Sequence, residues 1–292
     1  MVLSESARRG SPRRRVPIAD CHVQRVLLSF FDSAQFVQEK ERWCTTVEEL
    51  HRASVFLILG EKMPRVFGVI VTYVVLGTAL FTAWHASQYG FNAAQAAMAF
   101  FLVVNSMIAI WELCLYFQID FIRQQFAKLK LTYRGRELQR VGELFNTSLT
   151  WAAVVSPHTW AQIWATYSLF DESYSDTKSY GFWIDSGNGF TTLPASLLCL
   201  AGMTSGRVPS SSPSVATMAF GLLYFVVNYQ MFYGTVLYFA SYITNRRYEG
   251  HSLMNVVVFV GVSNLIWMIF PLFGMWAGWQ VLNEHSMAVF RN

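Results

Sequence analysis

One acidic residue stands inside a long apolar stretch of this chain. Glu112 is the single charged residue of residues 91–118, and Asn105 lies seven positions earlier, on the same face if the stretch is helical. An ionisable side chain is costly in the hydrocarbon of a bilayer, so it usually faces the interior of a helix bundle. A buried carboxyl can carry a proton, which makes Glu112 a candidate catalytic residue. The alternative is that Glu112 reaches water from the end of the stretch.

Two other apolar stretches carry polar and aromatic groups at helical spacing. One stripe is Asn264, Trp267 and Pro271, and the other is Gln230, Gly234, Tyr238 and Tyr242. With the stretch that bears Glu112, three segments thus present polar groups on one face each. This pattern predicts a mostly apolar cavity with a few hydrogen-bonding groups, which is the usual form of a site for a hydrophobic small molecule.

Each of these groups also has a purely structural interpretation. Asn264 could join two helices, and Trp267 could serve only in packing. Pro271 could introduce a kink, and the tyrosines near residue 242 could belong to an interfacial belt. The residue types alone leave these alternatives open.

The elements that must position these groups are membrane-spanning helices. Hydrophobic residues make up 53% of the 292 residues and charged residues only 14%, against about 25% in soluble domains. Five apolar stretches, 66–84, 91–118, 190–206, 215–243 and 253–282, approach or exceed the length of a bilayer crossing. We therefore expect an all-α integral membrane protein with a bundle of five transmembrane helices. Residues 143–170 form a sixth candidate whose Pro157 and His158 suit a re-entrant or interfacial segment better.

The chain divides into three parts by composition. Residues 1–62 form an N-terminal extension with apolar residues at helical spacing from Val23, typical of an amphipathic surface helix. Residues 63–283 form the membrane domain, with a long connection at 119–188, and residues 284–292 form a tail. The arginine-rich start of the extension also resembles a mitochondrial presequence, and a disordered cytoplasmic tail is the further alternative.

Charge and cysteine content exclude several classes of function. Basic residues gather before residue 66, in 119–143 and at 246–247, which predicts that these regions share the cytoplasmic side. The net charge of +4 therefore reflects topology, and we expect no nucleic-acid partner. The scattered cysteines and histidines form no CxxC or HExxH pattern, so we expect no metal site, and no nucleotide-binding motif indicates a cofactor.

Several motifs resemble the emopamil-binding protein family, also called the EXPERA superfamily. The fourth and fifth apolar stretches carry "YGTVLYF", with Tyr233 and Tyr238, and "NLIWMIFP", with Asn264 and Trp267. The segments "MIAIWELCLYF" and "WATYSLFDESYSDTKSY" are similar to the glutamate-bearing second span and to the stretch before the third span of that family. The resemblance covers residues 100 to 282 and implies a five-helix bundle around a sterol-sized cavity in an internal membrane.

The resemblance implies two kinds of function. The family includes sterol Δ8,Δ7-isomerases, intramolecular isomerases in which an acid protonates a ring double bond and a neighbouring carbon loses a proton. On that pattern Glu112 would carry the proton, Trp267 would face the carbocation and Asn264 would support it. The family also includes non-enzymatic binders of the sigma-2 receptor type.

Two departures from the isomerase pattern favour binding over catalysis. Ile108 stands where the enzymes have a histidine, and Ala195 stands where they have a second glutamate; Asp185 comes too early to be an obvious substitute. We therefore expect a divergent member that binds a sterol or lipid-like molecule through Glu112, Asn105, Gln230, Tyr233, Tyr238, Asn264 and Trp267. Isomerase activity is the first alternative, and an accessory subunit of a respiratory or photosynthetic complex is the second.

Location and assembly are less constrained by the sequence. The endoplasmic reticulum is the expected membrane, with the mitochondrial inner membrane or another organelle as the alternative. Membrane lipids are expected neighbours, and a homodimer and a larger membrane complex both stay open.

Overall fold

The computed structural model describes residues 63–206, 208 and 214–291, and this part of the chain is helical. Its single β pairing is one bridge between Arg65 and Ser148. The expected N-terminal extension, residues 1–62, lies outside the described residues.

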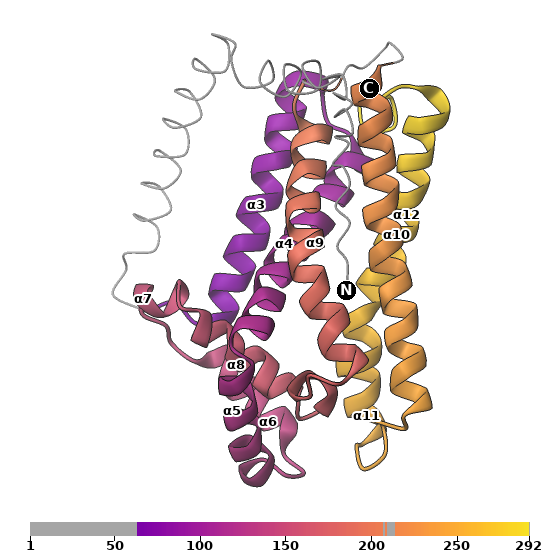
Figure 1. The fold of residues 1–292 in the computed structure, drawn as a ribbon. Coiled ribbons are helices and arrows are strands. Elements are labelled where there is room, and N and C mark those ends of the chain that lie inside the picture. Colours follow the sequence, from indigo (N-terminus) through magenta and orange to yellow (C-terminus); the bar gives the residue numbers. More distant parts are fainter. Residues whose placement is uncertain (1–62, 207, 209–213, 292) are drawn as a thin grey trace, which may run out of the picture. The chain divides into compact units, whose positions relative to one another are not determined.

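Long helices form a bundle, and shorter ones gather at one end of it (Figure 1). The long helices are α3 (Val66–Tyr89), α4 (Ala93–Phe117), α9 (Tyr180–Thr204), α10 (Val215–Thr244) and α12 (Ser263–Glu284). The short elements are α5 (Ile119–Thr132), α6 (Glu137–Asn146), α7 (Trp151–Val154), α8 (Pro157–Tyr167), the 3-10 turn η1 (Glu172–Ser175), α11 (Leu253–Asn255) and the π-helical segment η2 (Val256–Val262).

Local sequence signals set several helix ends. The Asn92 side chain accepts a hydrogen bond from the Gln95 backbone N–H at 2.9 Å and so caps α4. Ser179 and Ser214 cap α9 and α10 in the same way. Gly90 ends α3 with φ of 78°, a left-handed conformation that glycine adopts without strain.

Four described helical segments are long and apolar enough to cross a membrane: α3, α4, α10 and the continuous run Leu253–Glu284. The third expected span differs from the prediction, because α9 begins at Tyr180 rather than at residue 190. The polar residues before residue 190 hid this helical segment. Residues 143–170 do not form one long helix; they divide among the end of α6, α7 and α8, with Pro157 starting α8.

The described basic regions lie at one end of the bundle, which we call the basic end. The backbones of Arg65 and Ser148 form the β bridge there. Lys130 Nζ of α5 lies 2.5 Å from Glu172 Oε1. Arg247, which follows α10, lies 3.4 Å from Asp171. α5, α6, α8 and α11 all lie at this end in Figure 1. The expected common side for residues 119–143 and 246–247 therefore agrees with the arrangement of the helices.

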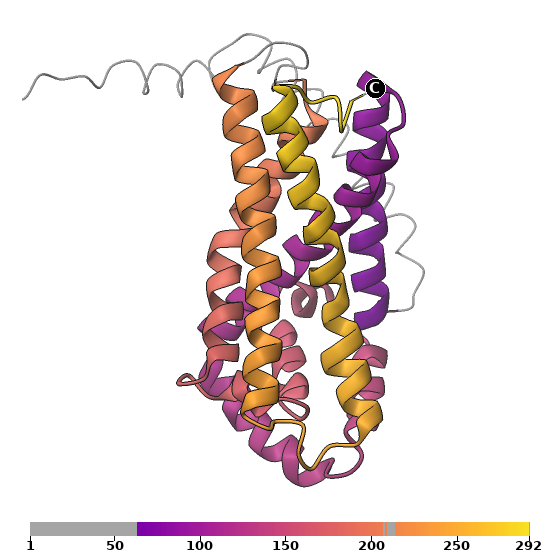
Figure 2. The same ribbon diagram turned by 90° about the vertical axis from the view of Figure 1, so that its right-hand side faces the viewer.

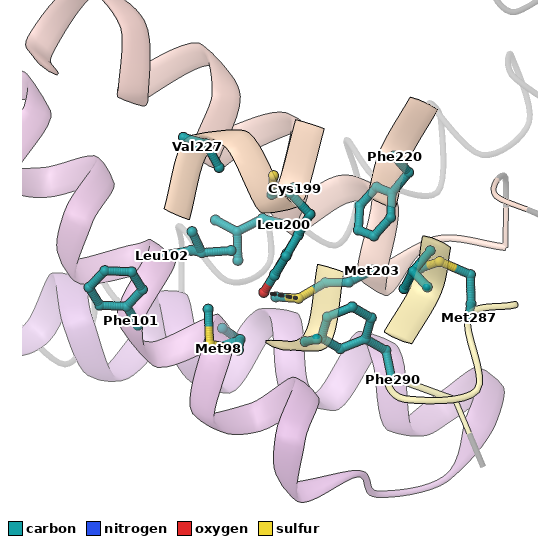
Figure 3. Packing of buried hydrophobic residues seen from close by; sticks show 14 of the residues in the cluster. Met98, Phe101, Leu102, Cys199, Leu200, Met203, Phe220, Val227, Met287 and Phe290 are labelled. Carbon is teal, nitrogen blue, oxygen red and sulfur yellow. Dashed lines mark hydrogen bonds between the residues drawn. The ribbon is translucent and has the colours of Figure 1, made fainter. Parts of the chain in front are cut away.

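The segment after α12 closes the opposite end, which we call the C-terminal end. Met287 and Phe290 are fully buried among side chains of α4, α9 and α10 (Figure 3). Arg291 donates hydrogen bonds to the carbonyl groups of Gly202 and Ser205, at 3.1 and 2.6 Å. A basic side chain thus satisfies carbonyl groups at the C-terminus of α9.

Glycines allow the closest helix contacts. A Cβ on Gly278 of α12 would lie 2.9 Å from the Phe225 backbone nitrogen of α10, and these helices run side by side in Figure 2. A Cβ on Gly189 of α9 would lie 2.8 Å from the Leu113 backbone nitrogen of α4. Such small-residue contacts bring backbones together where burial of apolar surface does not drive association.

Candidate functional site: a polar network inside the bundle

Asn105, near the middle of α4, forms hydrogen bonds that join α4 to α9 and α12. Its Nδ2 donates to the hydroxyl groups of Ser196 and Thr192 on α9, at 3.0 and 3.3 Å. Its Oδ1 accepts a hydrogen bond from Trp267 Nε1 on α12 at 2.9 Å. Asn105 is buried and Trp267 is half-buried. Two of the predicted ligand-binding residues therefore meet each other, and their polar stripes face the same interior.

Glu112 is buried, with 6% of its surface exposed. It packs against α9 where Gly189 leaves room, since a Cβ on Gly189 would lie 3.0 Å from Glu112 Cβ. Asp185 lies one helical turn before Gly189, on the face of α9 that packs against α4. Glu112 Oε2 has no hydrogen-bond partner among the described residues. The burial of Glu112 argues against the interpretation that it reaches water from the end of the stretch.

Gln230 extends this network towards the outer side of α9 and α10. Its Nε2 donates to Asn188 Oδ1 at 3.1 Å and to Thr191 Oγ1 at 2.6 Å. Gln230 itself is half-buried. Its contacts join α10 to α9 at Asn188, one residue before Gly189, the glycine that packs against Glu112.

A second group of polar contacts surrounds Asp171 at the basic end. Asp171 is buried, and its Oδ2 accepts a hydrogen bond from the Tyr238 hydroxyl at 3.0 Å and lies 3.4 Å from Arg247 Nη1. Its Oδ1 accepts the Ser173 backbone N–H at 3.0 Å. The Asp171 carboxylate is therefore satisfied from three directions, and it fixes the end of α10 against the segment before α9.

Tyr167 links this region to α12. Its hydroxyl donates to the Phe259 carbonyl in η2 at 2.9 Å, and it lies 3.3 Å from Asn264 Nδ2. A π-helical turn alters the regular hydrogen-bond ladder and is often found at functional positions. Burial raises the pKa of Tyr167 to about 12, so its hydroxyl remains a donor at neutral pH. Asn264 also donates to the Val260 carbonyl at 2.8 Å.

The structure does not bring Tyr233 to the network. Its side chain is 48% exposed and stacks on Tyr229, with ring centroids 5.6 Å apart. The neighbouring Gly234 faces inward and would place a Cβ 3.2 Å from Ile184 of α9. The motif therefore presents its glycine to the bundle and its first tyrosine to the surroundings.

Sequence reasoning missed the role of Asp185 because it placed the start of the third span too late. Once α9 is extended to Tyr180, Asp185, Asn188, Thr192 and Ser196 follow a helical repeat and share the face toward α4. The spacing of these polar residues was the available signal. Asp185 shares a face of α9 with Gly189, which packs against Glu112, so its early place in the sequence does not separate it from Glu112.

Two hollows that the described residues line lie beside α3, away from this network. One, of about 270 Å³, lies between α3, α4 and the α7–α8 segment, and the other, of about 550 Å³, lies at Arg65 and Asn146. Neither is lined by Glu112, Asn105 or Trp267. A ligand at the network would therefore have to break contacts between the packed helices. One of these contacts is the Trp267–Asn105 hydrogen bond, which joins α12 to α4.

The network can carry out two kinds of chemistry. Its hydroxyl, amide and indole groups can orient a polar atom of an otherwise apolar ligand. The Glu112 and Asp185 carboxyl groups can also accept or deliver a proton. Within residues 63–206, 208 and 214–291, no group of three metal-ligating side chains comes together.

Comparison with known proteins adds no assignment. No protein-family model, no curated protein and no solved structure matches this chain. The resemblance to the emopamil-binding protein family therefore rests on the motifs alone, and the functional argument rests on the network.

Proposed function

We propose that this integral membrane protein crosses the bilayer five times, with α9 as the fifth crossing helix. α4 ends at the basic end, and α10 begins at the C-terminal end, so the chain between them must pass from one end to the other. α9 makes this passage with 25 residues, which at 1.5 Å per residue span about 37 Å and exceed the thickness of a hydrocarbon core. The membrane of the endoplasmic reticulum is the proposed location.

Within this bundle, the protein binds a sterol-like hydrophobic molecule at the polar network. The observation that carries this proposal is the buried Glu112 carboxyl, which has an oxygen without a partner among the described residues. A carboxyl group inside an apolar bundle is costly, and an oxygen without a hydrogen-bond partner adds to that cost. A ligand with one hydroxyl group on a rigid apolar body would satisfy that oxygen once the contacts between α4, α9 and α12 separate to admit it. The sterol class itself comes from the motif resemblance.

Equilibrium binding of a radiolabelled sterol to the purified full-length chain tests this proposal. Glu112→Gln replaces one carboxyl oxygen by an NH₂ group that cannot accept the ligand's hydroxyl, and we expect binding about tenfold weaker, the loss of one hydrogen bond. Glu284→Gln is the matched control, because Glu284 is an exposed acid on α12. Equal affinities for the two variants would contradict the proposal. Mass spectrometry of lipids retained after gentle purification would identify the natural ligand.

One observation favours isomerase activity as the second candidate. Asp185 lies where it can act with Glu112, although Ala195 and Ile108 stand at the positions that the resemblance assigns to proton-handling groups. Glu112 would deliver a proton to one carbon of the ring double bond, and Asp185 would take one from the neighbouring carbon. Conversion of a Δ8 sterol in a strain without its own isomerase tests this, with loss of activity expected in both Glu112→Gln and Asp185→Asn. Growth that does not depend on these residues would exclude them as the catalytic groups.

A further inference from the structure

The hollow of about 270 Å³ beside α3 is separate from the polar network. Its walls come from Val69 and Tyr73 of α3, Met107 and Trp111 of α4, and the α7–α8 segment with Val154 and Trp160. Among the described residues, no charged side chain lines it. The chemistry of this lining decides which part of a molecule can enter.

Two polar groups in the walls already have partners within the protein. The Tyr73 hydroxyl lies 3.0 Å from Ser106 Oγ, and Trp160 Nε1 donates to the Val154 carbonyl at 2.8 Å. A polar occupant would lose its hydration without gaining a hydrogen bond from these two groups. Hydrocarbon suits such a surface. The volume is also below the usual range of about 300–1,000 Å³ for sites that enclose a whole small molecule, so the hollow fits part of a larger one.

A cation lies one helical turn away from the lining of this hollow. Arg65 immediately precedes α3, one helical turn before Val69, and its side chain is exposed. Its Nη1 donates to Asn146 Oδ1 at 3.1 Å, which holds the guanidinium beside the start of α3. Among the described residues, the second hollow, of about 550 Å³, is lined by Arg65 and Asn146 and by no acidic residue. Glu143, the acid nearest in sequence to Asn146, is instead engaged by Tyr133 and Gln139.

We propose that an anionic phospholipid binds here, with an acyl chain in the apolar hollow and its headgroup at Arg65. The positions of the two groups along α3 agree with such a lipid. Arg65 lies at the basic end, and the apolar hollow lies along the part of α3 that is long and apolar enough to span a membrane. Basic residues mark the cytoplasmic side, and the cytoplasmic leaflet carries the anionic lipids. The headgroup and chain of one lipid thus match a cation at the start of α3 and an uncharged hollow one helical turn further along this helix.

Native mass spectrometry of the purified full-length chain tests this proposal with two probes, palmitoyl-oleoyl-phosphatidylserine and palmitoyl-oleoyl-phosphatidylcholine. We expect about fivefold greater retention of the serine lipid, the preference that one basic residue near the surface provides. Arg65→Gln should reduce serine-lipid retention to that of the choline lipid. Val69→Trp should fill the hollow and abolish retention of both. Val75→Trp is the control, because Val75 is exposed on α3 and does not line the hollow.

Two results would overturn the proposal: equal retention of the two lipids by the natural chain, or a Val69→Trp variant that retains lipid as the natural chain does. If Val69→Trp melts at a lower temperature than Val75→Trp, Val154→Trp fills the hollow from the opposite wall, with the same expectation and the same contrary result. Glu112→Gln should leave phospholipid retention unchanged. Failure of this site is therefore distinguishable from failure of the site proposed at the polar network.

Discussion

At the C-terminal end of the bundle, buried polar side chains bind mainly the backbone, whereas towards the basic end side chains of different elements also bind one another. His85 Nδ1 lies 3.2 Å from the Met203 carbonyl, Asn228 donates to the Tyr224 carbonyl, and Arg291 donates to carbonyl groups at the end of α9. In the other half, contacts such as Trp267–Asn105 and Tyr238–Asp171 join side chains of different elements.

This difference separates polar groups that maintain the fold from groups that form a candidate site. Arg291 binds carbonyl groups at the end of α9, and this end of the bundle has an apolar core that includes Met98, Phe101, Leu102 and Leu200 (Figure 3). Side chains bound to each other converge on a common interior, and the buried acids Glu112 and Asp171 both belong to this half. The partners of the buried polar residues therefore indicate the candidate site better than the number of such residues does.

The first prediction concerns which sides of the membrane the two ends face, and the expected effect is all or none. Leu131 at the basic end and Val215 at the C-terminal end are both highly exposed. In a chain whose own cysteines are replaced by serine, Leu131→Cys and Val215→Cys should react with a membrane-impermeant reagent from opposite sides of sealed vesicles. Labelling of both from the same side would contradict five crossings.

The second prediction concerns the Asp171 carboxylate at the basic end, whose two oxygens both have partners. Asp171→Ala leaves Arg247 partly buried without its carboxylate and removes the acceptor of Tyr238, so we expect a loss of about 3–5 kcal/mol in the free energy of unfolding. Asp120→Ala is the control, since Asp120 is an exposed acid in an i,i+3 pair with Arg123. Denaturant unfolding measures both variants, and similar losses would show that Asp171 is not a buried anchor.

The third prediction compares two glycines of α9 that lie two positions apart. Gly189→Ala would press a methyl group against the α4 backbone near Glu112, whereas Gly187→Ala meets nothing within 4 Å. We expect Gly189→Ala to destabilise the protein by about 1–3 kcal/mol. Gly187→Ala should leave stability unchanged or slightly raised, because alanine is the better helix former. Equal thermal shifts would mean that α4 and α9 are farther apart than described.

The fourth prediction has the smallest effect on stability. Trp267→Phe keeps an aromatic ring but removes the N–H that donates to Asn105, which should cost about 1 kcal/mol. Trp276→Phe is the control, because Trp276 is 47% exposed on the same helix. If Trp267→Phe behaves like its control in thermal unfolding, the contact between α12 and α4 does not depend on this hydrogen bond.

The sequence could predict most of the helices but only part of the network. Apolar length revealed α3, α4, α10 and α12, and helical spacing placed Asn105 and Trp267 on interior faces. The start of α9 was missed because hydropathy falls where polar residues face a partner helix. A stripe of interior polar groups such as Asp185 and Asn188 lowers the average while the helix continues.

Tertiary partners could not be predicted from spacing at all. Asp171 belongs to a connection, and its contacts with Tyr238 and Arg247 join residues separated by 67 and 76 positions. Tyr233 shows the opposite case, since its motif indicated a site residue but the rotation of α10 exposes it. Helical periodicity gives the faces of one helix relative to each other, and only packing decides which face is interior.

Photo-crosslinking tests the central claim, that the polar network is a ligand site, most directly. The full-length chain would be labelled in membranes with a sterol that carries a diazirine, and adducts would be mapped by peptide sequencing. The account predicts adducts within residues 105–112, 185–196 and 264–267, lost on competition with unlabelled sterol and reduced in Glu112→Gln but not in Glu284→Gln. Adducts confined to exposed residues such as Leu198 and Ile269, insensitive to both competition and Glu112→Gln, would contradict it.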